Sequence, residues 1–462
     1  MRRLLQTSLL CLLVFCWTGS TLWAESALPR EERLQKAVAA GDYLCSVLRD
    51  NGRFLFEYNP VECKESEDYN WLSHSGAVLS LLRLQQVTGD KKYLAAAEKA
   101  AQAIEERIIP IKIGDQEFMV FLANPTGDGI RNGVVDTGEC ALSAMALAQL
   151  DQAGQAVAHK NAVQGLCRYL HHVQGGDGSL KSRYVVKDDA GQFANWHSPD
   201  YQGEALAALA TAREIYPSAE NLTCINRLVN FLAVEWALKD LEGGQEPFDY
   251  WGMIGFTRAF SFLDDGVLLQ VHEDYLNALK TKIMDIQARL TQGPLFDERR
   301  ALETHLARFD TKLNLMQKQG ALSRDTLLPL VFTYCNTEWK GQILDPGRTE
   351  HGSFWNAQGN SADTALRLEG LEAVHDLFVR TPGTPYQGWV RRWEPRLDLV
   401  RSFVAQCQYT PKDQEKFACP ISVAGGFRRH IHDGKGKSVR LDYCWHGVFA
   451  LLGRDASGSA SK

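Results

Sequence analysis

Pairs of amphipathic helices recur along most of this chain, and this repetition limits the folds open to it. The first clear pair has apolar residues at helical spacing from Leu72 to Leu84, a break at Gly89, and a second helical pattern from Tyr93. A repeated hairpin cannot bury its apolar face alone, so the units must stack. We predict twelve helices, at residues 31–49, 71–87, 91–107, 136–150, 159–173, 200–215, 222–240, 249–262, 322–337, 360–380, 387–408 and 440–453.

Both ends of this helical array are apolar. An open stack of repeats needs polar capping units, and neither the helix at 31–49 nor the helix at 440–453 reads as one. We therefore expect helix 440–453 to pack on helix 31–49, so that six hairpins close into a ring. The predicted fold class is all-α, with residues 25–263 and 321–455 in one domain.

The segment 264–320 does not follow the repeat. Its apolar residues are spaced alternately by three and four on both sides of a break at Gly293 and Pro294, which is a heptad seam. The seam consists of Leu276, Leu279, Ile283, Ile286 and Leu290, followed by Leu302, Leu306, Phe309, Leu313 and Met316. We predict an inserted antiparallel coiled-coil hairpin, an arm that is also a candidate surface for a protein partner. Two ordinary amphipathic surface helices are the alternative.

The N-terminal sequence predicts export. Arg2 and Arg3 precede an apolar run from Leu4 to Trp17, and small residues lead to a cleavage site after Ala24, as in a secretory signal peptide over 1–24. No other apolar run is long enough to span a bilayer. We expect a soluble periplasmic or extracellular protein with a disordered tail at 456–462.

Charge and motifs exclude several function classes. The chain has 50 Lys and Arg against 56 Asp and Glu, a net charge of −6, without a basic stripe for a nucleic-acid partner. No phosphate-binding loop, dinucleotide fingerprint, Gly-x-Ser-x-Gly elbow or His-Glu-x-x-His zinc motif is present. The sequence therefore predicts no cofactor and no metal.

The cysteines suggest disulfides. Of the 11 cysteines, nine lie beyond the predicted signal, so at least one stays unpaired. Cys407 and Cys419 bracket a polar loop, and Cys45 and Cys63 bracket a turn. These are the two pairs that we expect first.

Three hairpin motifs resemble those of a known superfamily. They are SHSGA at 73–77 with TGDKKYL at 88–94, YQGEAL at 201–206, and RLDYCWH at 440–446. They resemble the six-hairpin glycosidase-like superfamily of (α/α)6 toroids, over most of residues 31–453. The resemblance implies that the first helix of each hairpin lines the inside, that the preceding loops form the mouth of a cleft, and that the substrate is a carbohydrate.

Acidic residues gather where the first helices begin. Asp136, Asp249, Asp363 and Asp442 each stand at a predicted helix start, where capping of free backbone N–H groups is the simpler interpretation. Glu139 and Glu204 lie one turn further in, among residues that must face the core, so each is buried at a cost or faces a wet cavity. A capping box is the alternative for both.

These acids allow one catalytic interpretation, and other residues allow a second. Two carboxylates across a cleft can perform glycoside hydrolysis, which would use Glu139, Glu204 or Asp249. A uronic-acid lyase or epimerase would instead use His74 or Tyr201 as base. The further catalytic candidate is His446, and the predicted substrate-binding residues are Trp71, Trp196, Trp251, Trp355, Arg367 and Asp442.

Two interpretations of these side chains stay open. The aromatic residues can stack on sugar rings or simply fill the core, and a helical histidine is often a hydrogen-bonded core residue. The leading hypothesis is an exported enzyme that acts on an envelope or extracellular polysaccharide by acid/base chemistry. The alternative is a non-catalytic glycan-binding or assembly scaffold that uses the cleft and the arm.

Overall fold

The computed structural model describes residues 28–123, 132–187, 190–242, 248–263, 265–319, 324–381, 387–432 and 437–453. The predicted signal peptide (1–24) and tail (456–462) lie outside these residues. Within them, no helix is both long and apolar enough to cross a membrane.

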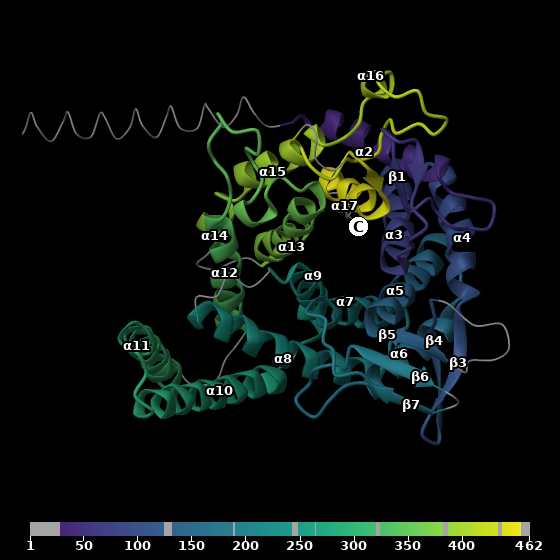
Figure 1. Cartoon of the computed structure of the whole chain (residues 1–462). Helices are drawn as coiled ribbons and strands as arrows, with labels where there is room; N and C mark the ends of the chain where they lie inside the picture. Colours follow the sequence, from purple (N-terminus) through teal and green to yellow (C-terminus); the bar gives the residue numbers. More distant parts are fainter. Residues whose placement is uncertain are drawn as a thin grey trace, which may run out of the picture. The chain divides into compact units, whose positions relative to one another are not determined.

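Each of the twelve predicted helices is confirmed, with boundaries shifted by a few residues (Figure 1). The one predicted at 387–408 is divided into two, α14 and α15. The helices are α2 (Arg30–Ser46), α3 (Trp71–Thr88), α4 (Lys91–Glu105), α5 (Thr137–Gly154), α6 (Lys160–His172), α7 (Asp200–Ile215), α8 (Ala219–Glu242), α9 (Tyr250–Ala259), α12 (Arg324–Lys340), α13 (Ser361–Arg380), α14 (Gln387–Val390), α15 (Glu394–Gln406) and α17 (Leu441–Leu452).

Contacts within the chain define two compact units. The central unit comprises residues 48–54 and 69–340, and the terminal unit comprises the chain up to residue 47, residues 55–68 and the chain from 341 on.

In the central unit, the first helices of successive hairpins pack against each other. Helix α3 contacts α5, α5 contacts α7, and α7 contacts α9, while α4, α6 and α8 pack on their own first helices. Small residues allow the close approach: a Cβ atom at Gly203 would collide with the backbone of Trp251 and Gly252. The starts of α5, α7 and α9 are thereby brought together.

Local signals set the first hairpin. The Asn70 side chain caps α3 by accepting a hydrogen bond from the Ser73 N–H at 2.8 Å, and Asp90 caps α4 through the Lys92 N–H at 2.9 Å. Gly89 between the two helices has φ 71°, a left-handed conformation that glycine adopts without strain. The sequence predicted this break correctly.

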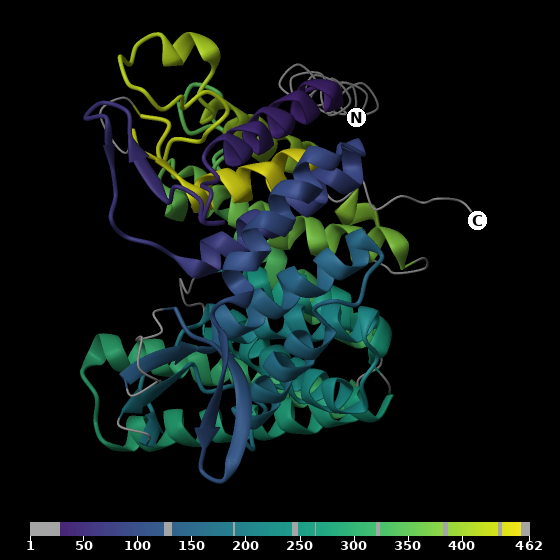
Figure 2. The same ribbon diagram turned by 90° about the vertical axis from the view of Figure 1, so that its right-hand side faces the viewer.

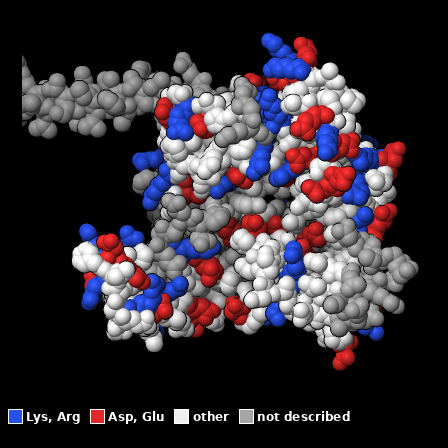
Figure 3. Space-filling model, in the orientation of Figure 1, with Lys and Arg blue, Asp and Glu red and all other residues white. Residues whose placement is uncertain are grey.

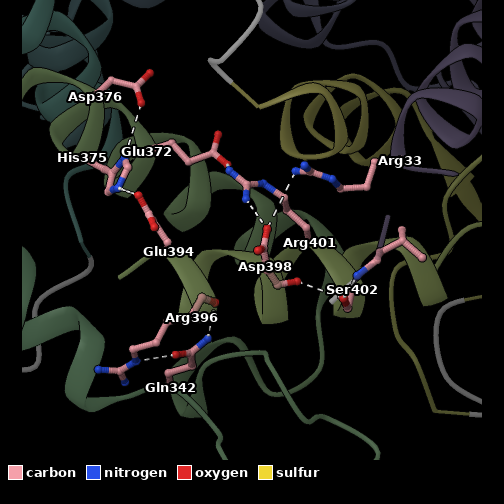
Figure 4. Close-up of polar contacts among 11 residues, drawn as sticks. Arg33, Gln342, Glu372, His375, Asp376, Glu394, Arg396, Asp398, Arg401 and Ser402 are labelled. Carbon is pink, nitrogen blue, oxygen red and sulfur yellow. Dashed lines mark hydrogen bonds and ion pairs between the residues drawn. The ribbon is translucent and has the colours of Figure 1, made fainter. Parts of the chain in front are cut away.

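In the terminal unit, α17 packs on α2, as predicted from the apolar ends of the array. A buried polar network supports α13 and α15 (Figure 4). The Arg401 guanidinium pairs with Glu372 on α13 and, at 2.6 Å, with Asp398 on α15, and Arg33 of α2 lies 3.9 Å from the same Asp398 carboxylate. Because Glu372 is buried, loss of Arg401 would leave an uncompensated charge.

Short strands occur in the connections, where the sequence predicted none. They are β1 (Glu57–Asn59), β2 (Lys64–Glu65) and β8 (Val439–Arg440) in one sheet, the β3 (Ile108–Ile113) and β4 (Gln116–Phe121) hairpin, and β5 (Asn132–Asp136), β6 (Arg183–Lys187) and β7 (Ala190–Phe193) in a third (Figure 2). All pairings are antiparallel. The alternation of apolar and polar residues that predicts a strand is hard to distinguish from a loop when it covers only a few residues.

The predicted insertion is a hairpin of α10 (Asp265–Thr291) and α11 (Phe296–Gln319). Its seam buries Leu279, Ile283 and Ile286 against Leu302, Phe309 and Met316, and its exposed face mixes both signs of charge (Figure 3). The hairpin does not project freely, because the start of α10 packs on α8. Supercoiling into a coiled coil stays a prediction.

We expect the seam to stabilise this hairpin alone. Ile283 is 7% exposed, whereas the neighbouring Met284 is 68% exposed. Ile283→Asp should place an unpaired carboxylate in the seam at a cost of several kcal/mol and unfold α10 and α11 locally, while Met284→Asp should change little. Hydrogen exchange would show protection lost only in residues 276–319. Loss throughout the central unit would instead make these helices part of its core.

The disulfide pairing differs from the expected one. Cys63 is bonded to Cys419, whereas Cys45 and Cys407 form no disulfide. The prediction paired cysteines that are close in sequence. The strand β1, paired with β8, instead brings the loop after β1 to the C-terminal segment across 356 residues of sequence.

Candidate active site

Helices α5, α7 and α9 lie in the central unit (Figure 1), and carboxylates gather where these helices begin. The cluster consists of Asp136, Glu139, Asp200, Glu204 and Asp249. Their mutual repulsion is felt at Glu204, whose carboxyl pKa is raised first by burial and then by the other four acids. The predicted convergence of acids at these helix starts is therefore seen within this unit.

Asp136 is held by an arginine. Its carboxylate accepts two hydrogen bonds from the Arg183 guanidinium, at 2.6 and 2.9 Å. Strand register places them together, because Asp136 of β5 stands opposite Arg183 of β6. The capping interpretation is wrong here, since the Asp136 side chain makes no cap hydrogen bond to α5.

An exposed aromatic ring adjoins this ion pair. The Arg183 guanidinium lies 4.2 Å from the centre of the Trp196 ring, and Trp196 meets Tyr201 edge to face at 5.7 Å. Trp196 is 44% exposed, so its ring can receive a ligand. The structure thus places the predicted Trp196 and Tyr201 beside the acids, and the Tyr201 pKa is raised by burial and by Asp136.

Glu139 is half-buried one helical turn after Asp136. Burial raises its carboxyl pKa to about 8, and the negative charge of Asp136 adds to the rise. A carboxylic acid that keeps its proton at neutral pH beside an ionised carboxylate can act as a general acid.

Glu204 is more deeply enclosed, at 4% exposure. Its Oε2 atom has no hydrogen-bond partner among the described residues, and a Cβ atom at Gly138 would collide with this carboxylate. The capping-box alternative is wrong for Glu204, because no side chain caps α7. Burial raises its pKa well above the ordinary value, as burial also does for Asp200.

Asp249 is a helix cap. Its carboxylate accepts hydrogen bonds from the Gly252 N–H at 2.7 Å and from the Trp236 indole N–H at 2.9 Å. Burial raises the pKa of Asp249 to about 6 against these two lowering contacts. Of the four predicted caps, Asp249 alone is confirmed, and this capping contact gives its carboxylate a structural role.

His74 lies fully buried in α3. Its Nε2–H donates to the Ala100 carbonyl at 3.0 Å, so Nδ1 accepts from the Tyr69 hydroxyl at 2.6 Å. Burial lowers the imidazole pKa to about 3. With both ring nitrogens engaged, His74 orients Tyr69 and is poorly placed to serve as the predicted base.

Two predicted sugar-binding tryptophans are core residues instead. Trp71 and Trp251 are each 4% exposed. Trp71 packs between the guanidinium of Arg107, 4.0 Å from its ring, and the ring of His74. Their burial supports the packing interpretation that the sequence left open.

The other predicted residues belong to the terminal unit. Asp442 pairs with Arg440, and Arg367 donates to the Asp363 carbonyl at 2.8 Å, so neither Asp442 nor Asp363 caps its helix through its side chain. The buried His446 donates from Nδ1 to Glu369 at 2.7 Å. Trp355 is 55% exposed with Arg348 over its ring.

Sequence reasoning missed Arg183 and assigned Asp136 to capping. Both belong to short strands, whose pairing was not predicted. An arginine followed by the β-branched and aromatic run Tyr-Val-Val at 184–186 is the signal that was available. Within the described residues, no group of three or more His, Cys, Asp or Glu is arranged to hold a metal ion.

Glu204 should make stability depend on pH. A carboxyl whose pKa is raised on folding stabilises the protein below its ordinary value of 4.5, and this stabilisation is lost as the pH rises. Glu204→Gln cannot ionise and so removes this loss. Its free energy of unfolding should therefore gain on that of the wild type as the pH rises above about 5, by up to about 1.4 kcal/mol per unit of pKa rise, seen as a higher thermal midpoint. Exposed Glu98→Gln is the control. If the thermal midpoints of Glu204→Gln and the wild type changed equally with pH, a protonated Glu204 would be contradicted.

Comparisons with known proteins bear on the fold. No protein-family model and no curated protein sequence matches the chain. Among solved structures, a D-mannose isomerase matches with a TM-score of 0.55 at 12% identity, over 91% of this chain and 95% of that one. The chain has the (α/α)6 toroid fold.

Two further structures share this (α/α)6 toroid fold. A sugar epimerase from a ruminal bacterium matches with a TM-score of 0.52 at 9% identity, over 92% of this chain and 99% of that one. An α-1,6-mannanase from Salegentibacter sp. HEL1_6 matches with a TM-score of 0.50 at 13% identity, over 91% of this chain and 98% of that one. At these identities the likeness concerns the fold.

Proposed function

We propose that this protein is an exported glycoside hydrolase. One observation carries the proposal: Glu139, whose carboxyl pKa burial raises to about 8, lies a helical turn from Asp136, and the Arg183 partner of Asp136 lies 4.2 Å from the exposed ring of Trp196. Hydrolysis of a glycosidic bond needs an acid and an ionised carboxylate near one sugar-binding surface. The fold supports the proposal, since a mannanase, a mannose isomerase and a sugar epimerase share it.

In this mechanism Glu139 gives its proton to the glycosidic oxygen as the bond to the anomeric carbon breaks. The Asp136 carboxylate stabilises the positive charge that develops at that carbon, and Arg183 fixes its orientation. Water supplies the hydroxyl group of the new reducing end, and its remaining proton restores the acid. Burial and the negative charge of Asp136 both raise the pKa of Glu139, which favours its protonated form.

The lyase or epimerase alternative has less support. Its proposed base His74 is buried with both nitrogens hydrogen-bonded, and burial raises the pKa of Tyr201, which therefore holds its proton. The Arg183 guanidinium beside the clustered acids already donates two hydrogen bonds to Asp136, so it is not available to bind the carboxylate of a uronic acid. A neutral glycan is the better substrate for this site.

The signal sequence and the Cys63–Cys419 bond support export, because disulfides persist in oxidising compartments. We therefore place the substrate among neutral envelope or extracellular polysaccharides. Mature protein should be incubated with neutral and uronic-acid polysaccharides, and the products read by mass spectrometry. Products that gain one water support a hydrolase, unsaturated ends support a lyase, and intact glycans that still bind the protein favour the non-catalytic scaffold.

The α10–α11 hairpin supports a second, separate role. Its turn exposes Leu295 (83%) and Phe296 (78%), large apolar side chains that water does not favour. We propose this turn as the contact for a protein partner. Leu295→Ser with Phe296→Ser should abolish that association and leave glycan hydrolysis unchanged.

A further inference from the structure

A pocket of about 430 Å³ lies within the terminal unit. It forms where the Cys63–Cys419 disulfide joins the loop after β1 to the segment after α16 (Pro411–Gln414). Tyr409 and Phe417 line it, with their rings edge to face at 5.8 Å. This volume falls among those of small-molecule sites, and none of the five clustered acids of the central unit takes part.

The ionisable side chains of this lining are mostly basic. It includes Lys416, Arg428, His432 and Lys437, against one acid, Asp413. Asp413 is already paired with Lys416 at 2.8 Å, and His432 lies 3.0 Å from Glu350. Arg428 and Lys437 are therefore left as the uncompensated charges of the pocket.

Both of these cations have unused hydrogen-bonding capacity. Arg428 donates from Nη2 to the Gln406 carbonyl at 3.1 Å, but its buried Nε has no partner among the described residues. The described part of the chain likewise offers no hydrogen-bond or ion-pair partner to the Lys437 ammonium, whose residue is exposed. A buried donor without a partner costs free energy that a bound acceptor would recover.

We propose that this pocket binds a sugar acid the size of one monosaccharide. Arg428 and Lys437 hold its carboxylate, and its ring lies against Tyr409 and Phe417. Arginine matches the planar, two-oxygen geometry of a carboxylate, and aromatic rings present apolar faces to the C–H groups of a sugar. A neutral sugar would leave both cations unsatisfied. The site is distinct from the proposed hydrolase site and does not depend on it.

Isothermal titration of the full mature chain tests the proposal, with D-glucuronate, D-glucose and inorganic phosphate as probes. Glucuronate should bind, glucose should not, and phosphate should bind more weakly because it makes no ring contact. Lys437→Gln and Arg428→Gln should each weaken glucuronate binding about tenfold. Lys412→Gln, an exposed lysine outside the pocket, should bind like the wild type.

Three outcomes would overturn the assignment: glucose binding as tightly as glucuronate, phosphate binding as tightly as glucuronate, or wild-type binding by both charge variants. Arg428→Lys keeps the charge and guards against a folding defect, and should retain more affinity than Arg428→Gln. Glu139→Gln should bind glucuronate normally, whatever its activity. If Glu139→Gln lost glucuronate binding and Lys437→Gln kept it, glucuronate would bind at the acid cluster, and the assignment to this pocket would be refuted.

Discussion

Glu139→Gln is expected to lower kcat on a neutral oligosaccharide about a thousandfold, within the range that general acid catalysis contributes. The amide has nearly the shape of the carboxylic acid but cannot give up a proton to the glycosidic oxygen. Because Glu139 is already uncharged below its pKa of about 8, the substitution should leave the fold intact at pH 7. Initial rates and circular dichroism of the same preparations would measure both effects.

The pH profile separates a catalytic Glu139 from a merely structural one. In the wild type, kcat/KM should fall above about pH 8, tenfold per unit, as Glu139 loses its proton. The residual activity of Glu139→Gln should lack this alkaline limb. Glu98→Gln, which changes an exposed glutamate on α4, should keep both the wild-type kcat/KM and its fall at alkaline pH. Full turnover by Glu139→Gln would remove this residue from the mechanism.

Helical periodicity was sufficient to predict the framework. The helices are long, their apolar spacing extends over several turns, and stops such as Gly89 have one strong conformational preference. The contact of α17 with α2 also followed from the sequence, because two apolar ends must be covered. Helical spacing, helix stops and apolar surface can all be identified from the residues of one segment alone.

The candidate site was only partly predictable, because some of its contacts join segments that are far apart in the sequence. Glu139 and Glu204 could be identified because a carboxylate on a core-facing helix position is unusual wherever it occurs. The partner of Asp136, by contrast, depends on the register of β5 against β6, which brings in Arg183 from 47 residues away. The burial of His74 and Trp71 depends in turn on their contacts with α4 and Arg107, and no pattern within α3 predicts those contacts.

The Cys63–Cys419 bond should be the largest single covalent contribution to stability. It closes a loop of 356 residues, and the loop-closure estimate for so long a connection is about 6 kcal/mol. Cys63→Ser with Cys419→Ser should therefore lower the thermal midpoint by roughly 6 °C, and reductant should shift the wild type but not the double variant. Cys45→Ser, which removes a cysteine that forms no disulfide, is the control. If the double variant melts with the wild type, β1 and β8 hold these two segments together without the bond, because their pairing already closes the same loop.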